Sequence, residues 1–271
     1  MLHSELQSYS TLVLETKLLG RLYTKPAYIL FLLLHELQKP ESDRIQWLYW
    51  FDLDIVLMNP NIPLSIFLPP PSLNLSDAHI PQAIVTNDHN GLNTGAFFVR
   101  VSQWSAQLFA DIVAMPSLQP SVPLKYSEQS AMELRLTDPR NKGKAVWVPQ
   151  HWFNGYRGSR DERGELREVT PEATRKGGLQ IHFAGKAVNK ERMGLFLDIA
   201  ESADPRWELP LERTGLVEET RVFWEEWAEG LQVGSQGAEK KTVKATIAAA
   251  SVEDVASATG SSSLETGLEA S

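Results

Sequence analysis

The sequence predicts an α/β protein with a mostly parallel central sheet. Segments with the period of a strand alternate with segments with the period of a helix along most of the chain, which is the order of strand–helix–strand units. In addition, five large apolar residues follow one another without a break from Trp47 to Phe51. A continuous run of this kind is typical of a central strand that is covered on both faces.

The individual elements follow from local patterns. Pro26 favours the first turn of a helix that we expect to run from Lys25 to Leu37. In residues 103–114 the apolar side chains recur at every fourth position, which predicts an amphipathic helix. Besides the apolar run, the expected strands are 11–14, 83–86, 96–99, 145–148 and 179–183. The other expected helices are 128–136, 190–201 and 216–231.

The composition divides the chain into two parts. We expect residues 1–232 to form one folded domain, because the apolar and aromatic residues gather there. No aromatic residue follows Trp227, and Ala, Ser, Thr, Gly and Glu dominate the last segment. Residues 233–271 are therefore predicted to be a disordered tail.

Charge and composition exclude several classes of function. The formal net charge of −8 argues against nucleic-acid binding, which requires a basic face. The chain has no cysteine, which excludes disulfides, thiolate metal sites and a cysteine nucleophile. The longest apolar run, residues 27–34, is far shorter than the ~20 residues of a membrane span. The first ten residues lack a basic-then-apolar signal pattern, so we expect neither a signal nor an anchor in this chain.

The strongest chemical signal is the pair Asp52 and Asp54, directly after the apolar run. Ligands of open α/β sheets bind at the carboxyl ends of strands, and in an extended segment both side chains would lie on one side. Two neighbouring carboxylates repel each other unless a cation lies between them. We therefore expect the pair to hold Mn²⁺, or alternatively Mg²⁺, together with water and phosphate oxygens. The alternative is an exposed turn that carries two solvated acids.

Three further segments carry polar groups that suit a ligand. Residues 87–95 combine Asn, Thr and two glycines, which suits sugar hydroxyls but also a plain hairpin turn. Glu128 and Gln129 begin a helix, where an acid is favoured by the helix dipole even without a ligand. His182 lies in an apolar strand that ends in Ala-Gly and is followed by Lys186. It is predicted to be either a core histidine or a third metal ligand.

Taken together, these motifs resemble the fungal α-galactosyl/α-mannosyltransferase family that also contains the plant xyloglucan xylosyltransferases. They occur in the order of that family over about residues 25–200. The matching stretches are Trp47–Asp54 with Met58-Asn-Pro60, Asn90–Gly95 with Arg100 and Gln103–Ser105, Glu128–Ser130, Val148–Gln150 with Asn154, and His182–Gly185.

The resemblance implies a GT-A fold, a nucleotide-sugar donor, Mn²⁺ and transfer of a hexose or pentose to a glycan or glycoprotein acceptor with retention of the α configuration. It also implies the Golgi lumen as the location and allows assembly with other glycosyltransferases. Carried over by position, the residues with implied roles are Asp52, Asp54 and His182 at the metal, Asp52, Asn93, Gly95 and Lys186 at the donor, and Glu128 and Gln129 as catalytic residues at the sugar. The metal and the lysine would absorb the charge that develops on the leaving diphosphate.

The chain also departs from the family pattern. Only 51 residues precede Asp52, so we expect the first strand of the GT-A fold to be missing and the domain to be truncated at its N-terminus. A first alternative is therefore a catalytically inactive remnant that binds a sugar or a partner glycosyltransferase. A second is a phosphohydrolase of the haloacid-dehalogenase type, which also begins with Asp-x-Asp after an apolar strand. That chemistry requires a downstream acidic cluster, and the sequence contains no Asp-Asp and no Gly-Asp.

Overall fold

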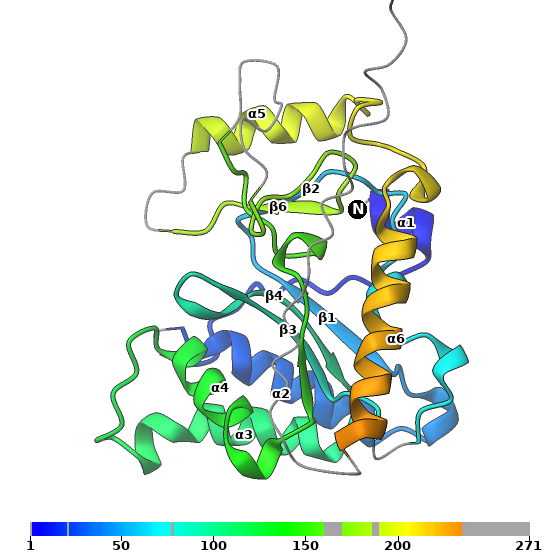
Figure 1. The fold of residues 1–271 in the computed structure, drawn as a ribbon. Coiled ribbons are helices and arrows are strands. Elements are labelled where there is room, and N and C mark those ends of the chain that lie inside the picture. The colour runs from blue at the N-terminus through cyan, green and yellow to red at the C-terminus, as the bar shows by residue number, and fades with distance from the viewer. Residues whose placement is uncertain (1, 21, 77–78, 160–169, 186–189, 235–271) are drawn as a thin grey trace, which may run out of the picture. The chain divides into compact units, whose positions relative to one another are not determined.

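The computed structural model describes residues 2–20, 22–76, 79–159, 170–185 and 190–234 (Figure 1). The predicted tail lies outside the described residues except for 233–234, so the domain boundary stays a prediction. Lys186 also lies outside the described residues. The described helices are α1 (Leu2–Gln7), α2 (Thr24–Leu37), α3 (Gln103–Leu118), α4 (Glu128–Leu136), α5 (Lys190–Glu201) and α6 (Leu216–Gly234). The described strands are β1 (Trp47–Phe51), β2 (Ile55–Leu57), β3 (Ala83–Asp88), β4 (Gly91–Arg100), β5 (Ala145–Trp147) and β6 (Gln180–His182).

The α/β class is confirmed, but the prediction of a mostly parallel sheet is wrong for the described strands. The main sheet has the order β1-β4-β3-β5, and only the β3–β5 pair is parallel. The reason is the segment 87–95, part of which forms the hairpin turn that the sequence left open as an alternative. β3 and β4 are joined by a two-residue turn in which Asp88 pairs with Gly91, so β4 must run antiparallel to β3.

The apolar run at residues 47–51 forms β1 as expected, at the edge of the described sheet rather than in its centre. Its two faces are nevertheless covered. Leu48 and Trp50 pack against one hydrophobic cluster, and Trp47 and Tyr49 pack against another. An edge strand that is covered in this way has the same sequence pattern as a central one.

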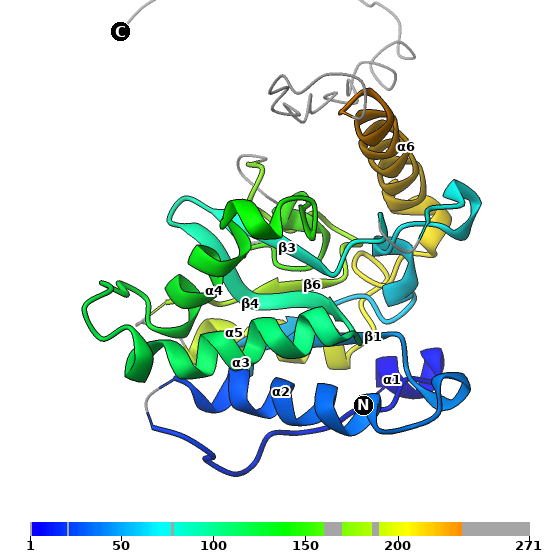
Figure 2. The ribbon, with the colours of Figure 1, turned by 90° about the horizontal axis from the view of Figure 1, so that it is seen from below.

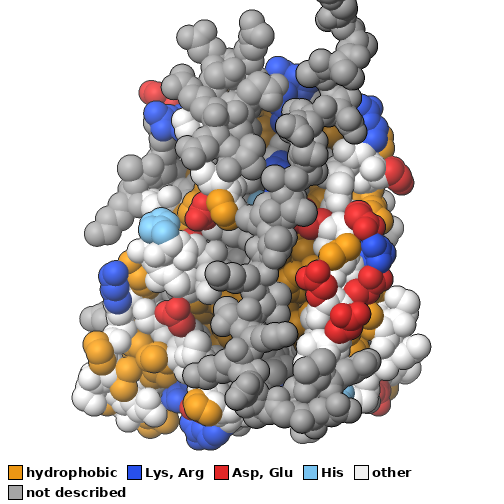
Figure 3. All heavy atoms as spheres, in the orientation of Figure 1, with side chains coloured by type: hydrophobic (Ala, Val, Ile, Leu, Met, Phe, Trp, Pro, Cys, Tyr) orange, Lys and Arg blue, Asp and Glu red, His pale blue; other side chains and the backbone are white. Residues whose placement is uncertain are grey.

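Helices cover one face of the main sheet, and loops and a further helix cover the other. α2, α3 and α4 lie together on the first face (Figure 2). There Leu33, Phe97 and Phe109 belong to one buried hydrophobic cluster. On the second face Trp224 of α6 is buried with Phe98 and Trp152. The outer face of α6 carries acidic side chains, which Figure 3 shows along that side of the molecule.

A second, two-stranded sheet positions part of the site. β2 and β6 pair antiparallel in a register that places His182 opposite Ile55. Val56 and Ile181 of these strands are buried with Phe196 of α5, which anchors the pair. Burial of these apolar side chains fixes the register, because a slip by one residue would turn them toward water.

A local signal explains where α3 begins. The Ser102 hydroxyl caps α3 by accepting a hydrogen bond from Ser105 N at 3.2 Å. The predicted strand at 11–14 is absent, because residues 11–13 are exposed and the segment pairs with no strand among the described residues. None of the described helices combines the length and the apolar character that a membrane span requires.

Candidate metal and donor site

An open cleft of about 710 Å³ lies where β1, the β3–β4 hairpin, α4 and β6 meet. Polar and charged side chains dominate its lining. The lining residues are Asp52, Asp54, Asp88, His89, Asn90, Asn93, Gly95, Gln129, Tyr156, Arg157, Gly158, His182, Phe183, Ala184, Gly185 and Arg192.

The three predicted metal ligands lie together in this cleft. Asp52, Asp54 and His182 each offer one ligand atom, and these atoms lie within 4.8 Å of one another. His182 Nε2 is 3.4 Å from Asp54 Oδ1. The imidazole is buried, whereas the two carboxylates are half-buried and face the cleft. Such a set of oxygen and nitrogen ligands can hold a divalent cation.

Two strand registers bring these residues together. The β1–β4 ladder continues past Phe51, where Asp52 N donates to Gly95 O at 2.8 Å. The β2–β6 ladder continues in the same way, because Phe183 N donates to Asp54 O at 2.8 Å. The segment between the aspartates is a turn, closed by Ile55 N donating to Asp52 O at 3.2 Å, and not the extended segment that was expected. Leu53 at its tip is 87% exposed, which leaves both carboxylates free to face the cleft.

Asn154 fixes the orientation of the His182 ring. Its amide nitrogen donates to Thr86 Oγ1 at 2.8 Å and to the carbonyl oxygen of Asn93 at 3.1 Å. Because the backbone carbonyl only accepts, the amide oxygen of Asn154 must face His182 Nδ1, which lies 2.8 Å away. His182 Nδ1 therefore carries the proton, and Nε2 points toward Asp54.

The charge at Asp54 depends on this histidine. Burial alone would raise the pKa of Asp54, but the interaction with the neighbouring His182 outweighs this effect, and the pKa is lowered below its ordinary value. Asp54 is therefore a carboxylate at neutral pH, the form that binds a cation.

Gly95 is required by the close approach of His182. A Cβ added at Gly95 would lie 2.0 Å from His182 Cε1, so any side chain here would displace the ring. The second glycine of this motif thus makes room for a ligand residue of the protein itself.

The hairpin side of the cleft carries groups that suit sugar hydroxyls. Asn93 donates to Asp88 Oδ2 at 2.9 Å and to Tyr156 Oη at 2.7 Å, and Tyr156 in turn donates to Asp88. Burial, and next the hydrogen bond to Asp88, raise the pKa of Tyr156 far above its ordinary value, so the phenol stays protonated. Gln129 lies beside them, and its side-chain oxygen accepts from Thr94 N at 3.1 Å.

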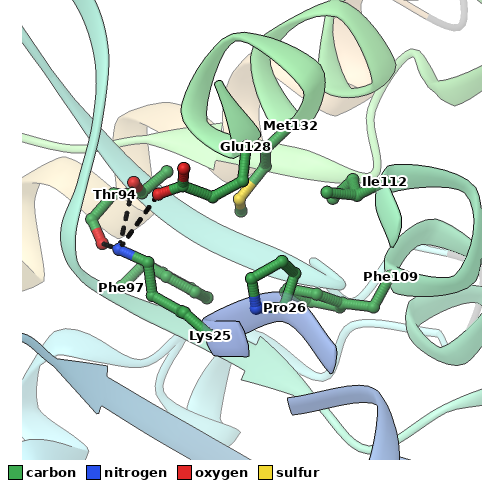
Figure 4. A pocket seen from close by; sticks show the side chains of 8 residues that line it. All are labelled: Lys25, Pro26, Thr94, Phe97, Phe109, Ile112, Glu128 and Met132. Carbon is green, nitrogen blue, oxygen red and sulfur yellow. Dashed lines mark hydrogen bonds and ion pairs between the residues drawn. The ribbon is translucent and has the colours of Figure 1, made fainter. Parts of the chain in front are cut away.

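Glu128 lies beneath the cleft rather than in its wall. It is 7% exposed and lines a small cavity of about 10 Å³ together with Lys25 and Thr94, which Figure 4 shows at close range. Burial raises the pKa of Glu128, and the charge of Lys25, whose Nζ lies 3.7 Å from Glu128 Oε1, opposes this shift.

Several residues of the site were not predicted from the sequence. Asp88, Tyr156, Arg157 and Arg192 line the cleft, and Lys25 contacts Asp52 at 3.2 Å. Asp88 lies in the polar segment 87–95, so the sequence pattern could have identified it as a site residue. The others stand outside any polar motif, and only the tertiary fold brings them to the site.

The comparisons with known proteins relate part of the chain to a galactosyltransferase. The probable alpha-1,2-galactosyltransferase gmh1 of Schizosaccharomyces pombe is 27% identical over 169 residues, which are 52% of this chain and 48% of that protein. The chain thus spans about half the length of this relative. A glycosyltransferase involved in the glycosylation of the major capsid of PBCV-1 superposes with a TM-score of 0.49 and 18% identity, over 71% of this chain and 88% of that one.

A family model also matches part of the chain. The model of the galactosyl transferase GMA12/MNN10 family matches residues 73–192, which contain Asn93, Gln129 and His182. Together with the yeast relative, this match supports the family that the motifs of the sequence predict. The matched segment begins after the two aspartates, so their place in the site rests on the geometry described above.

Proposed function

We propose that this chain is a metal-dependent retaining glycosyltransferase, which transfers a hexose or pentose from a UDP- or GDP-sugar to a glycan or glycoprotein acceptor with an α linkage. The observation that carries the proposal is the convergence of Asp52, Asp54 and His182 in one polar cleft. The family match and the galactosyltransferase name of the yeast relative support it and make a galactose donor the first to test.

The residues of the cleft fit a divalent cation. Asp54 and His182 would hold it, with Asp52 beside them, and the orientation of His182 by Asn154 gives the imidazole the correct tautomer for a ligand. A mixed carboxylate and imidazole set suits Mn²⁺ better than Mg²⁺, which prefers oxygen ligands alone. When bound, the cation supplies positive charge that stabilises the leaving diphosphate.

The remaining groups bind and orient the donor. Because Thr94 N occupies the oxygen of Gln129, this side chain offers its amide N–H groups to a sugar in the cleft. Asn93 positions Asp88 and Tyr156, whose oxygens can accept hydrogen bonds from sugar hydroxyls. We propose that Arg157 and Arg192, together with Lys186, add positive charge near the diphosphate. The resemblance to the family makes the Golgi lumen the proposed location.

The test is slow hydrolysis of the donor, which requires no acceptor. Purified chain would be incubated with Mn²⁺ and a panel of UDP- and GDP-sugars, and nucleotide release would be measured with and without a chelator. We expect release from at least one donor only in the presence of Mn²⁺, and loss of at least about 90% of the rate in Asp54→Asn.

Asp111→Asn is the matched control, because it makes the same change on the exposed surface of α3. It should leave the rate unchanged. Absence of release from every donor by a folded chain that still binds Mn²⁺ would favour the inactive remnant over the transferase.

A further inference from the structure

Lys25 contacts several oxygens at the edge of the cleft. It is the second residue of α2, and its side chain is only 14% exposed. Its Nζ lies 3.2 and 3.3 Å from the two oxygens of Asp52, and 2.9 and 3.3 Å from the carbonyl and hydroxyl oxygens of Thr94. Glu128 Oε1 lies 3.7 Å away. Figure 4 shows the side chain pointing toward Thr94 and Glu128.

This cation makes the two aspartates of the site unequal. Asp52 is held by Lys25 and also by Trp50, whose Nε1 donates to Asp52 Oδ1 at 2.7 Å. Asp54 instead faces the imidazole of His182. A carboxylate that already shares its charge with a lysine attracts a further cation less strongly than one that does not.

Lys25 also lies beside the buried carboxyl group of Glu128. Oε1 of that carboxyl group faces the lysine, whereas the second oxygen, Oε2, is buried without a hydrogen-bond partner among the described residues. One ammonium group thus donates hydrogen bonds to Asp52 and forms an ion pair with Glu128.

We infer that Lys25 is a positioning residue that divides the work of the two aspartates. It fixes the orientation of Asp52 at the cleft and of Glu128 beneath it, and it leaves Asp54 and His182 as the principal protein ligands of the cation. This inference rests on the proposed function. It assigns a role to a residue outside the motifs, in the first turn of a helix that otherwise packs against the sheet.

The test compares Lys25→Met, which keeps the length of the side chain and removes its charge, with Lys39→Met. Lys39 is the matched control, because it lies just beyond the other end of α2 and pairs with Glu36 at 2.6 Å, away from the cleft. Binding of Mn²⁺ alone would be measured by electron paramagnetic resonance of the free ion, and donor hydrolysis at saturating Mn²⁺.

Removal of the lysine charge should tighten Mn²⁺ binding roughly tenfold, because a competing cation disappears. In the same variant kcat of donor hydrolysis should fall at least about tenfold, because Asp52 loses its fixed orientation. Lys39→Met should change neither value. Lys25→Arg, which keeps the charge in a wider group, should retain the parent affinity for Mn²⁺ and lose part of the rate.

The outcomes separate the inference from the proposed function. If the parent chain binds no Mn²⁺, both are overturned. If the parent binds Mn²⁺ and hydrolyses a donor, and Lys25→Met differs only in stability, as Lys39→Met does, the inference alone is wrong. A Lys25→Arg variant that tightens Mn²⁺ binding as much as Lys25→Met would also overturn the charge argument.

Discussion

Replacement of Asn154 by alanine separates the support of the metal site from the support of the fold. Asn154 is fully buried, and its amide bridges His182 to Asn93 and Thr86. The substitution removes both the acceptor at His182 Nδ1 and the donor to two oxygens on the sheet. The ring of His182 then loses the contact that fixes its proton and its direction.

The expected magnitudes follow from these contacts. Leaving buried polar groups without partners costs ~1–3 kcal/mol each, and because Thr86 Oγ1 can rotate, we expect a total loss of stability of roughly 2–4 kcal/mol. Loss of a hydrogen-bonded support behind a metal-binding histidine typically lowers metal affinity ~10–100-fold. The affinity for Mn²⁺ should therefore fall by ~1.4–2.8 kcal/mol.

Asn59→Ala is the matched control for this experiment. Asn59 is also fully buried, and its amide donates to Gly177 O at 2.8 Å and to Leu209 O at 3.0 Å. It follows the C-terminal end of β2, whereas Asp54 precedes the N-terminal end. Urea denaturation should show similar losses for both variants, whereas titration with Mn²⁺ should show weaker binding only for Asn154→Ala. Equal Mn²⁺ affinities in the two variants would refute the role assigned to Asn154.

Two further substitutions test the packing around the site and the anchoring of α6. Gly95→Ala should weaken Mn²⁺ binding at least about tenfold, because its Cβ displaces His182. The control is Gly194→Ala, at a helical position with open space, which should leave the Mn²⁺ titration unchanged. An equal loss of Mn²⁺ binding in Gly194→Ala would contradict the steric argument. Glu219→Gln should destabilise the chain by ~1–3 kcal/mol at neutral pH, because Glu219 of α6 pairs with buried His151 at 2.8 Å. Burial raises the pKa of Glu219, but the hydrogen bond and the charge of His151 outweigh this effect and lower the pKa below its ordinary value of 4.5. The stability that the pair contributes is therefore present above pH 4.5 and is lost as the pH falls through the lowered pKa. Thermal unfolding of both chains from pH 7 to 3 should show the difference shrinking below pH 4.5, and a constant difference would contradict the ion pair.

Much of the fold could be predicted from the sequence because its elements have strong local signals. The helix at 128–136 and the apolar run at 47–51 occur with the predicted bounds. Periodicity and turn residues act within a few positions of the chain, so they specify the type of an element without its neighbours. The antiparallel pairing of β1 with β4 depends on side chains about fifty positions apart, and no local pattern contains that information.

The site was predictable where its residues stand at strand ends, and not where they come from elsewhere. Asp52 and Asp54 follow an apolar run, and His182 interrupts another, so each is visible as a polar residue in an apolar context. β2 has only three residues and shows no alternation, so its pairing with β6 could not be foreseen. Lys25 had no signal of its own, because a lysine in the first turn of a helix is an ordinary surface residue.

The central claim is that Asp54 and His182 hold a divalent cation in the cleft, and direct titration with Mn²⁺ tests it most simply. The free ion would be followed by electron paramagnetic resonance in the parent chain, in Asp54→Asn and in His182→Gln. We expect one ion per parent chain and an affinity at least about tenfold lower in each variant. Equal binding by all three chains, or no binding by the parent, would contradict the account.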